Sequence, residues 1–220
     1  MNLRIDLLRH GETTLSHTLR GSTDDELTEL GWQQMRQTIQ QHQEKQKDQS
    51  SLQQSTQTYA QNWDVIYCSN LQRCEKFAEQ LAGELALLWI EDSRLQEMHF
   101  GDWEGISTQQ IYDEQPELLA NFWQFPTQFT PPNAEKLLDF QQRIVEAFSQ
   151  LKMNMLQSQQ QSALVVTHGG VIKLLKCISL NRPLDDILKM SAELGQLNSF
   201  NLLIDSVSND FQIELLEVNI

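Results

Sequence analysis

The sequence predicts an α/β fold, with a mostly parallel central sheet, helices on both faces and a small inserted cap lobe. Three observations lead to this prediction. Strand-like apolar runs alternate with helix-like amphipathic runs along most of the chain, which is the order that produces parallel sheets. Two of the strand-like runs end in a histidine followed by glycine, at His10 and His168, as expected where a chain turns sharply at a strand end. At 220 residues, the chain can bury a large core within one domain.

Six strands are expected, because six short runs are apolar or alternate between apolar and polar residues. Their expected ranges are 3–8, 63–67, 87–90, 163–166, 200–204 and 211–218. The run at 163–166 is continuously apolar, which indicates a strand buried on both faces. A short turn around 208–209 separates the last two runs, so we expect these two strands to pair as an antiparallel hairpin at the sheet edge.

Four helices are expected from apolar residues at helical spacing. They begin near residues 29, 72, 137 and 170. Thr28 is the expected N-cap of the first helix, and Ser69 with Gln72 forms a capping-box pattern ahead of the second. The second helix places Arg73 in its first turn.

Two segments interrupt this alternation. Residues 40–61 are rich in glutamine and nearly free of apolar residues, which predicts a solvated helix extension or a loop without chemistry. Residues 95–133 hold seven of the seventeen aromatic residues, and we expect them to form a cap lobe packed by its own aromatic side chains. Such a lobe could also present an aromatic wall to a substrate.

Composition excludes several classes of protein. The net charge of -14 argues against nucleic acid as a partner, because no basic stripe offsets phosphate repulsion. No apolar run approaches the length of a membrane span, and no secretory leader is expected. Three cysteines without framework spacing indicate reduced thiols in the cytoplasm. No metal or other cofactor is expected, and the chain is compatible with a homodimer.

Two histidines are expected to meet at one edge of the sheet. His10 follows the first strand, and His168 follows the buried strand at 163–166. The carboxyl ends of parallel strands lie at the same edge, where α/β proteins bind ligands. A neutral imidazole, with a reference pKa of about 6.5, is a nucleophile at neutral pH. Each histidine alone could be a hydrogen-bonded structural residue, but two such turns in one chain favour a shared site.

The residues around these histidines suit an anion. Arg9 precedes His10, and Thr13 adds a hydroxyl group. Gly169 opens a helix whose N-terminal amides can bind an anion. Arg73 lies at a helix start, where a positive charge is unfavourable without a nearby anion, although an acidic neighbour on the helix surface could pair with it instead. Together these residues predict a phosphate site.

The segments that hold these residues resemble the signature of the histidine phosphatase superfamily, in its phosphoglycerate-mutase-like branch. Four blocks agree in order and spacing: Leu-Arg-His-Gly-Glu-Thr at 8–13, Cys-Ser-Asn-Leu-Gln-Arg-Cys at 68–74, Leu-Gln-Glu-Met-His-Phe-Gly-Asp-Trp-Glu-Gly at 95–105, and Val-Val-Thr-His-Gly-Gly at 165–170. The resemblance implies a phosphoglycerate-mutase-like fold and a single domain over residues 1–220.

The resemblance also implies roles for individual residues. His10 would accept the phosphoryl group as phosphohistidine, and Glu97 would protonate the leaving alkoxide and later activate water. The implied catalytic residues are His10, Glu97, His168, Arg9 and Arg73, and the implied substrate-binding residues are Thr13, Gly21 and Gly169. No metal is required, because arginines and histidines supply positive charge. The implied partner is a small phosphate ester.

The substrate is less well defined. Mutases of this family usually have arginine directly after the acid glutamate, where this chain has Met98, so a phosphatase is favoured over a phosphoglycerate mutase. The string from Glu97 to Glu104 resembles that of α-ribazole-5'-phosphate phosphatases of cobalamin biosynthesis. The segment at 16–22 departs from the family pattern. A broad-specificity sugar or nucleotide phosphatase and a non-catalytic phospho-ligand binding module stay as alternatives.

Overall fold

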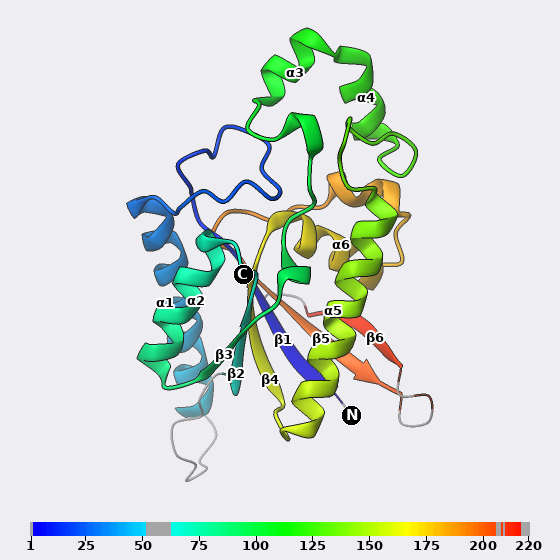
Figure 1. Ribbon diagram of the computed structural model, residues 1–220. Coiled ribbons are helices and arrows are strands. Elements are labelled where there is room, and N and C mark those ends of the chain that lie inside the picture. Colours follow the sequence, from blue (N-terminus) through cyan, green and yellow to red (C-terminus); the bar gives the residue numbers. More distant parts are fainter. Residues whose placement is uncertain (1, 52–62, 206–207, 209, 217–220) are drawn as a thin grey trace.

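A computed structural model describes residues 2–51, 63–205, 208 and 210–216 and contains one six-stranded sheet (Figure 1). The strand order is β3-β2-β4-β1-β5-β6. The strands are β1 (Asn2–Arg9), β2 (Val65–Cys68), β3 (Leu88–Glu91), β4 (Ser162–Thr167), β5 (Leu197–Ile204) and β6 (Phe211–Leu215). The first four of these strands pair in parallel, whereas β5 runs antiparallel to both β1 and β6. The predicted mostly parallel α/β fold and its edge hairpin are therefore confirmed.

Alternating side chains of the central strands face two separate helix layers. Ile5 and Leu7 of β1 belong to an apolar cluster that also contains the buried residues of α5 (Leu137–Gln157) and α6 (Gly169–Ser179). Leu8 belongs to a second cluster with α1 (Glu29–Ser51) and α2 (Gln72–Leu85). Figure 1 shows these two helix pairs on opposite sides of the sheet. Because β4 is buried from Ala163 to Thr167, its strand end is fixed from both faces.

The first helix begins as predicted and is longer than its apolar face. The Thr28 hydroxyl accepts a hydrogen bond from the Gly31 amide at 3.1 Å, which confirms this N-cap. The helix α1 continues to Ser51, so residues 40–51 of the glutamine-rich segment are a helix extension. Residues 52–62 lie outside the described ranges.

The capping box predicted for α2 is wrong. The N-cap position is Leu71, which has no side-chain cap, and the Gln72 amide donates to the Asp24 carboxylate at 2.8 Å. Ser69 lies two residues before this N-cap, and its hydroxyl instead bonds the His168 ring at 2.8 Å. The hydroxyl that looked like a helix cap therefore belongs to the catalytic edge of the sheet.

The lobe at 95–133 lies over the carboxyl ends of the parallel strands (Figure 1) and contains the short helices α3 (Thr108–Glu114) and α4 (Pro116–Gln124). Trp103 and Phe122 are buried and meet edge to face, with ring centroids 5.6 Å apart. Both belong to the apolar cluster of β1 and α5, so the lobe extends the main core in addition to packing on itself. Tyr112, Trp123 and Phe125 are 58%, 51% and 38% exposed, which leaves three aromatic side chains at the lobe surface.

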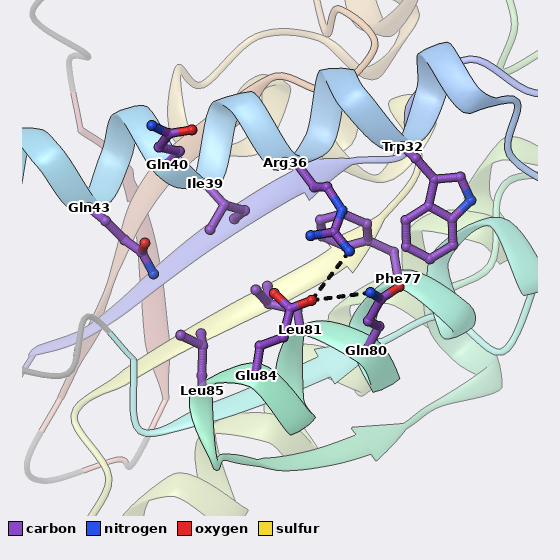
Figure 2. A pocket seen from close by; sticks show the side chains of 10 residues that line it. All are labelled: Trp32, Arg36, Ile39, Gln40, Gln43, Phe77, Gln80, Leu81, Glu84 and Leu85. Atoms are coloured by element: carbon purple, nitrogen blue, oxygen red, sulfur yellow. Dashed lines mark hydrogen bonds and ion pairs between the residues drawn. The ribbon is translucent and has the colours of Figure 1, made fainter.

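A groove of about 450 Å³ separates the outer sides of α1 and α2 (Figure 2). Trp32 and Phe77 form its apolar floor at one end, with ring centroids 5.5 Å apart. Arg36 and Glu84 pair across it at 3.2 Å. Within the described ranges, no helix combines the length and apolar character needed to cross a bilayer.

Candidate active site

Parallel pairing of β1 and β4 brings the two histidines together. Arg9 pairs with Thr167 in register, and the His10 amide donates to the Thr167 carbonyl at 3.0 Å. Each histidine is the first residue after its strand. Their ring centroids lie 5.3 Å apart, at an interplanar angle of 61°. Two imidazoles that are 158 positions apart in the numbering therefore share one site.

The His10 ring is held as a neutral imidazole of defined tautomer. Its Nδ1 lies 2.8 Å from the Gly11 carbonyl oxygen, which can only accept, so Nδ1 carries the proton and Nε2 carries a free lone pair. Burial lowers the pKa of His10 well below 6.5, and the positive charges of Arg73, Arg9 and Arg20 lower it further. The ring is therefore an unprotonated base at neutral pH, as a nucleophile must be.

His168 has the opposite tautomer. Its Nδ1 accepts from Nε of Arg73 at 3.3 Å, so Nε2 carries the proton and donates to the Ser69 hydroxyl at 2.8 Å. Burial and the neighbouring Arg73, His10 and Arg9 lower the pKa of His168 well below 6.5. The Cys74 thiol lies 3.7 Å from the same ring, but burial raises its pKa to about 12, so it stays a neutral thiol.

Asp25 holds two of the arginines in place. One carboxylate oxygen pairs with Arg20 at 2.6 Å and the other with Arg73 at 3.1 Å. Arg73 also donates to the carbonyls of Gly21 at 2.9 Å and Thr23 at 2.6 Å. Arg73 is 1% exposed, so its guanidinium lies behind the imidazoles as a fixed positive charge. Sequence reasoning did not select Arg20, because the segment at 16–22 departs from the family pattern, and it did not select Asp25, whose partner Arg73 lies 48 positions away.

The side chains of Glu97 and Arg9, which come from other segments, lie beside the first residues of α6. One Glu97 carboxylate oxygen accepts from the Gly170 amide at 2.9 Å and the other from the Met98 amide at 3.0 Å. A Cβ on Gly170 would lie 2.1 Å from the carboxylate, so only glycine permits this approach. Arg9 donates to the Ala192 carbonyl at 2.5 Å. The helix start therefore positions the expected acid–base group.

These groups line a cavity of about 210 Å³. Its lining includes two chemically distinct sets of residues. The set that we call the polar end consists of Arg9, His10, Arg20, Glu97, Gly169 and Gly170, and the set that we call the apolar end consists of Leu19, Met98, Phe100, Phe122, Trp123, Leu137, Phe140, Ile187 and Leu188. Among the described residues, Nε of Arg9 and Nε of Arg20 are buried without a hydrogen-bond partner. Two buried donors without acceptors at one end of a cavity indicate an anionic ligand.

The remaining predicted residues divide between the cavity and its support. Gly169 lines the cavity. Thr13 and Gly21 are not among the described residues that line it: the Thr13 amide and hydroxyl bond Ser16, and the Gly21 amide bonds Glu104 at 2.8 Å. His168 and Arg73 are not among the described residues that line the cavity. They adjoin it, because the His168 ring contacts His10 and accepts a hydrogen bond from Arg73.

Glu104 organises the loop that holds Arg73, a function that sequence reasoning missed. Its carboxylate accepts hydrogen bonds from the amides of Gly21, Ser22, Thr23 and Phe100 and from the Thr23 hydroxyl. Burial opposes ionisation, but these hydrogen bonds outweigh it and lower the pKa of Glu104. The loop carbonyls are then fixed where Arg73 can bind them. The sequence does contain Glu104 within the family-like Trp-Glu-Gly string at 103–105. A string of residues does not show which groups a carboxylate contacts, so this role could not be predicted.

Fold and site together define a phosphoryl-transfer enzyme with two histidines, and comparison with known proteins agrees. Residues 5–206 match the family described as histidine phosphatase superfamily (branch 1). The chain belongs to this superfamily, and the family and enzyme class predicted from the four blocks are confirmed.

Individual relatives are distant. A putative phosphoserine phosphatase 2 of Hydrogenobacter thermophilus is 25% identical over 80% of this chain and 77% of its own length. An adenosylcobalamin/α-ribazole phosphatase of Escherichia coli is 26% identical over 88% of this chain and 87% of its own. A bifunctional protein of Mycobacterium tuberculosis is 27% identical over 94% of this chain, which spans only 52% of that relative's length. The solved structure of a mycobacterial glucosyl-3-phosphoglycerate phosphatase matches with a TM-score of 0.78 at 23% identity, over 99% of this chain and 98% of the other, and shows the shared fold.

Proposed function

We propose that the protein is a metal-independent phosphomonoesterase that works through a phosphohistidine at His10. One observation carries the proposal: a neutral imidazole with a free Nε2 lies at the cavity end where Arg9 and Arg20 present buried donors without partners. Preorganised positive charge of this kind stabilises the charge that develops in a transition state.

In the first step, the His10 Nε2 lone pair attacks phosphorus while the ester P–O bond breaks. Arg9 and Arg20 bind the phosphoryl oxygens, and Arg73 adds its charge from behind the rings. Protonated Glu97 gives its proton to the leaving alkoxide, so an alcohol departs. The nitrogen–phosphorus bond that forms replaces the oxygen–phosphorus bond that breaks.

In the second step, water attacks the phosphohistidine. Glu97, now a carboxylate, accepts the proton of the attacking water, the nitrogen–phosphorus bond breaks, and His10 regains its lone pair. Inorganic phosphate leaves and Glu97 is again protonated. Its two backbone hydrogen bonds, from Met98 and Gly170, keep the carboxylate on the same side of the site in both steps.

The alcohol portion of the ester would occupy the apolar end of the cavity. We propose α-ribazole-5'-phosphate as one candidate, because a relative named for it is 26% identical and because Phe100, Phe122 and Phe140 offer aromatic surface. A cavity of about 210 Å³ is smaller than the roughly 300–1,000 Å³ typical of drug-sized ligands. A benzimidazole nucleoside would therefore extend past the partly exposed Trp123 into solvent. The same apolar end also suits a broad-specificity phosphatase.

We further propose that the protein acts in a reducing compartment such as the cytoplasm. Cys68, Cys74 and Cys177 are all buried and free, which is typical of intracellular thiols. A homodimer and the lack of a nucleic-acid partner stay predictions.

The test is hydrolysis of an aryl phosphate in the presence of EDTA. We expect the wild type to remain active and His10→Ala to be inactive, with His17→Ala, an exposed histidine of the same segment, as the matched control. Full activity of His10→Ala would show that His10 is not the nucleophile. Loss of wild-type activity in EDTA that Mg²⁺ or Zn²⁺ restores would contradict metal independence.

A further inference from the structure

Lys173 is a cation of the cavity that the proposed phosphoryl chemistry does not use. It lies in α6, three residues after Gly170 and four after Gly169, so it lies on the helix face that carries both glycines. The described residues that line the cavity include three cationic side chains, Arg9, Arg20 and Lys173. The two arginines lie close enough to His10 to lower its pKa. Lys173 lies about one helical turn further along α6 than the two glycines.

Lys173 has no hydrogen bond or ion pair with any residue that the structure describes. Its charged neighbours are Glu97, Arg9 and Glu193. The Glu97 carboxylate already accepts two backbone amides, and Glu193 is exposed. Burial lowers the pKa of Lys173, which shows that its ammonium group is partly desolvated. Nζ of Lys173 is not among the buried atoms that lack a partner, so it stays open to the cavity, where the anionic group of a bound ligand can pair with it.

The neighbouring Lys176 shows what a satisfied lysine looks like on the same helix. Its Nζ donates to the Ser191 carbonyl at 2.7 Å, and it is not among the residues that line the cavity. Two lysines one turn apart therefore differ in one respect that matters here: Lys173 faces the cavity without a protein acceptor.

We propose that the natural substrate is a phosphate monoester whose leaving group carries a second acidic group, such as a carboxylate, and that Lys173 binds that group. This inference rests on the proposed phosphatase activity and deepens it. The same cavity is also lined by the apolar Met98, Leu137 and Phe140, so the ammonium group of Lys173 supplies the charge that Met98 cannot. The absence of arginine after Glu97 then no longer argues against an acidic ester, because a different element provides the cation.

The test compares matched ester pairs that differ by one carboxylate: phosphoserine with phosphoethanolamine, and 2-phosphoglycolate with ethyl phosphate. The value of kcat/KM is measured for the wild type, Lys173→Met, Lys173→Arg and the control Lys176→Met. We expect the wild type to prefer the carboxylated ester by about 10-fold or more, in line with a charge-assisted hydrogen bond. Lys173→Met should lose about 10- to 100-fold on that ester and less than about 3-fold on its neutral partner, whereas Lys173→Arg and Lys176→Met should keep the preference.

Two results would overturn the inference. An equal loss on both members of a pair in Lys173→Met would show that Lys173 serves the phosphoryl group or Glu97. A wild type without any preference, or with a preference for α-ribazole-5'-phosphate over every acidic ester, would show that no second acid is recognised. Thermal unfolding of each variant separates these results from misfolding.

Failure of the proposed phosphatase function can be distinguished from failure of the inference about Lys173. If no ester is hydrolysed, or if His10→Ala hydrolyses aryl phosphate normally, the phosphohistidine mechanism fails. Calorimetric binding of 2-phosphoglycolate and ethyl phosphate then still decides the role of Lys173, because the carboxylated ester should bind more tightly to the wild type and no more tightly to Lys173→Met. Equal binding of both esters by the wild type would contradict it.

Discussion

The two ends of the active-site cavity are built differently. At the polar end, which is the proposed phosphate end, His10 and its supporting residues His168 and Arg73 are 3%, 0% and 1% exposed, and each is fixed by hydrogen bonds to the protein. At the leaving-group end, the walls come from the lobe at 95–133 and from the segment near Ile187, and Trp123 is half exposed. The phosphate end is rigid because strands buried on both faces end there.

This difference separates the residues proposed to carry out phosphoryl transfer from those proposed to select the ester. Groups at strand ends keep their geometry through the core, so phosphoryl transfer can stay constant while the lobe changes. The apolar end has no charged residue of its own, and the charged side chain that we assign to leaving-group recognition is Lys173, which lines the same cavity. Mutations at the phosphate end should therefore affect every ester, and mutations at the leaving-group end should affect only some.

Removal of the nucleophile should have the largest effect. We expect His10→Ala to lower kcat by roughly 10⁴-fold or more on all esters, because the covalent intermediate can no longer form. Steady-state kinetics on one small and one bulky ester would measure this. A variant that lost activity on the bulky ester alone would contradict the assignment of His10 to the phosphate end.

The substitution Arg20→Met should have the next largest effect on activity. Loss of a charged donor should lower kcat/KM by about 10²–10³-fold on every ester. It should also raise the pKa of His10 toward 6.5, because Arg20 is one of the charges that lower it. In the proposed mechanism, neutral His10 is the reactive form and is lost as pH falls through its pKa, so the acidic limb of kcat/KM, which reports the free enzyme, should move to higher pH.

The acidic limb is measured between pH 4 and 8, with Arg182→Met as the control because Arg182 lies on the surface (59% exposed). Histidine titration by NMR provides a direct check. An unchanged limb with a tenfold or greater loss of activity would mean that Arg20 acts on the substrate without influencing His10.

Glu104→Gln should have an intermediate effect. The variant keeps the shape but loses the charge that accepts the amides of Gly21, Ser22 and Thr23, so the free energy of unfolding should fall by about 1–3 kcal/mol. Because the pKa of Glu104 is lowered in the folded state, this stabilisation is present above the ordinary carboxyl pKa and is lost as pH falls through the folded value.

Denaturant unfolding at pH 7 and below pH 4 would measure that difference for Glu104→Gln. The neighbouring Asp102, which is exposed, provides the control Asp102→Asn. Activity should fall on all esters alike, since the loop supports Arg73. A loss of activity confined to bulky esters would indicate that Glu104 supports the leaving-group end instead of the phosphate end.

Trp123→Ala should have the smallest effect. Trp123 is half exposed and stands at the apolar end, so stability should change by less than about 0.5 kcal/mol. KM should rise several-fold for bulky aromatic esters and stay nearly constant for small ones. Tyr112→Ala, an exposed aromatic of the same lobe, is the control, and an equal effect of both variants would indicate a general change in the lobe.

The sequence predicted the phosphate end better than the leaving-group end, for physical reasons. Local periodicity located the strands, and parallel pairing then required His10 and His168 to meet. Periodicity could not reveal that Ser69 turns toward His168 instead of capping a helix, because both uses place a hydroxyl before α2. The contacts of Asp25 with Arg73 and of Glu104 with residues 21–23 join segments far apart in the chain, and such contacts leave no periodic signal.

The most direct test is to trap the intermediate. A short reaction with a ³²P-labelled aryl phosphate, quenched in alkali and followed by peptide mapping, should give an acid-labile phosphate on the peptide that contains His10. His10→Ala should give none. Label on another residue, or a burst of alcohol release without any labelled protein, would contradict the proposed role of His10.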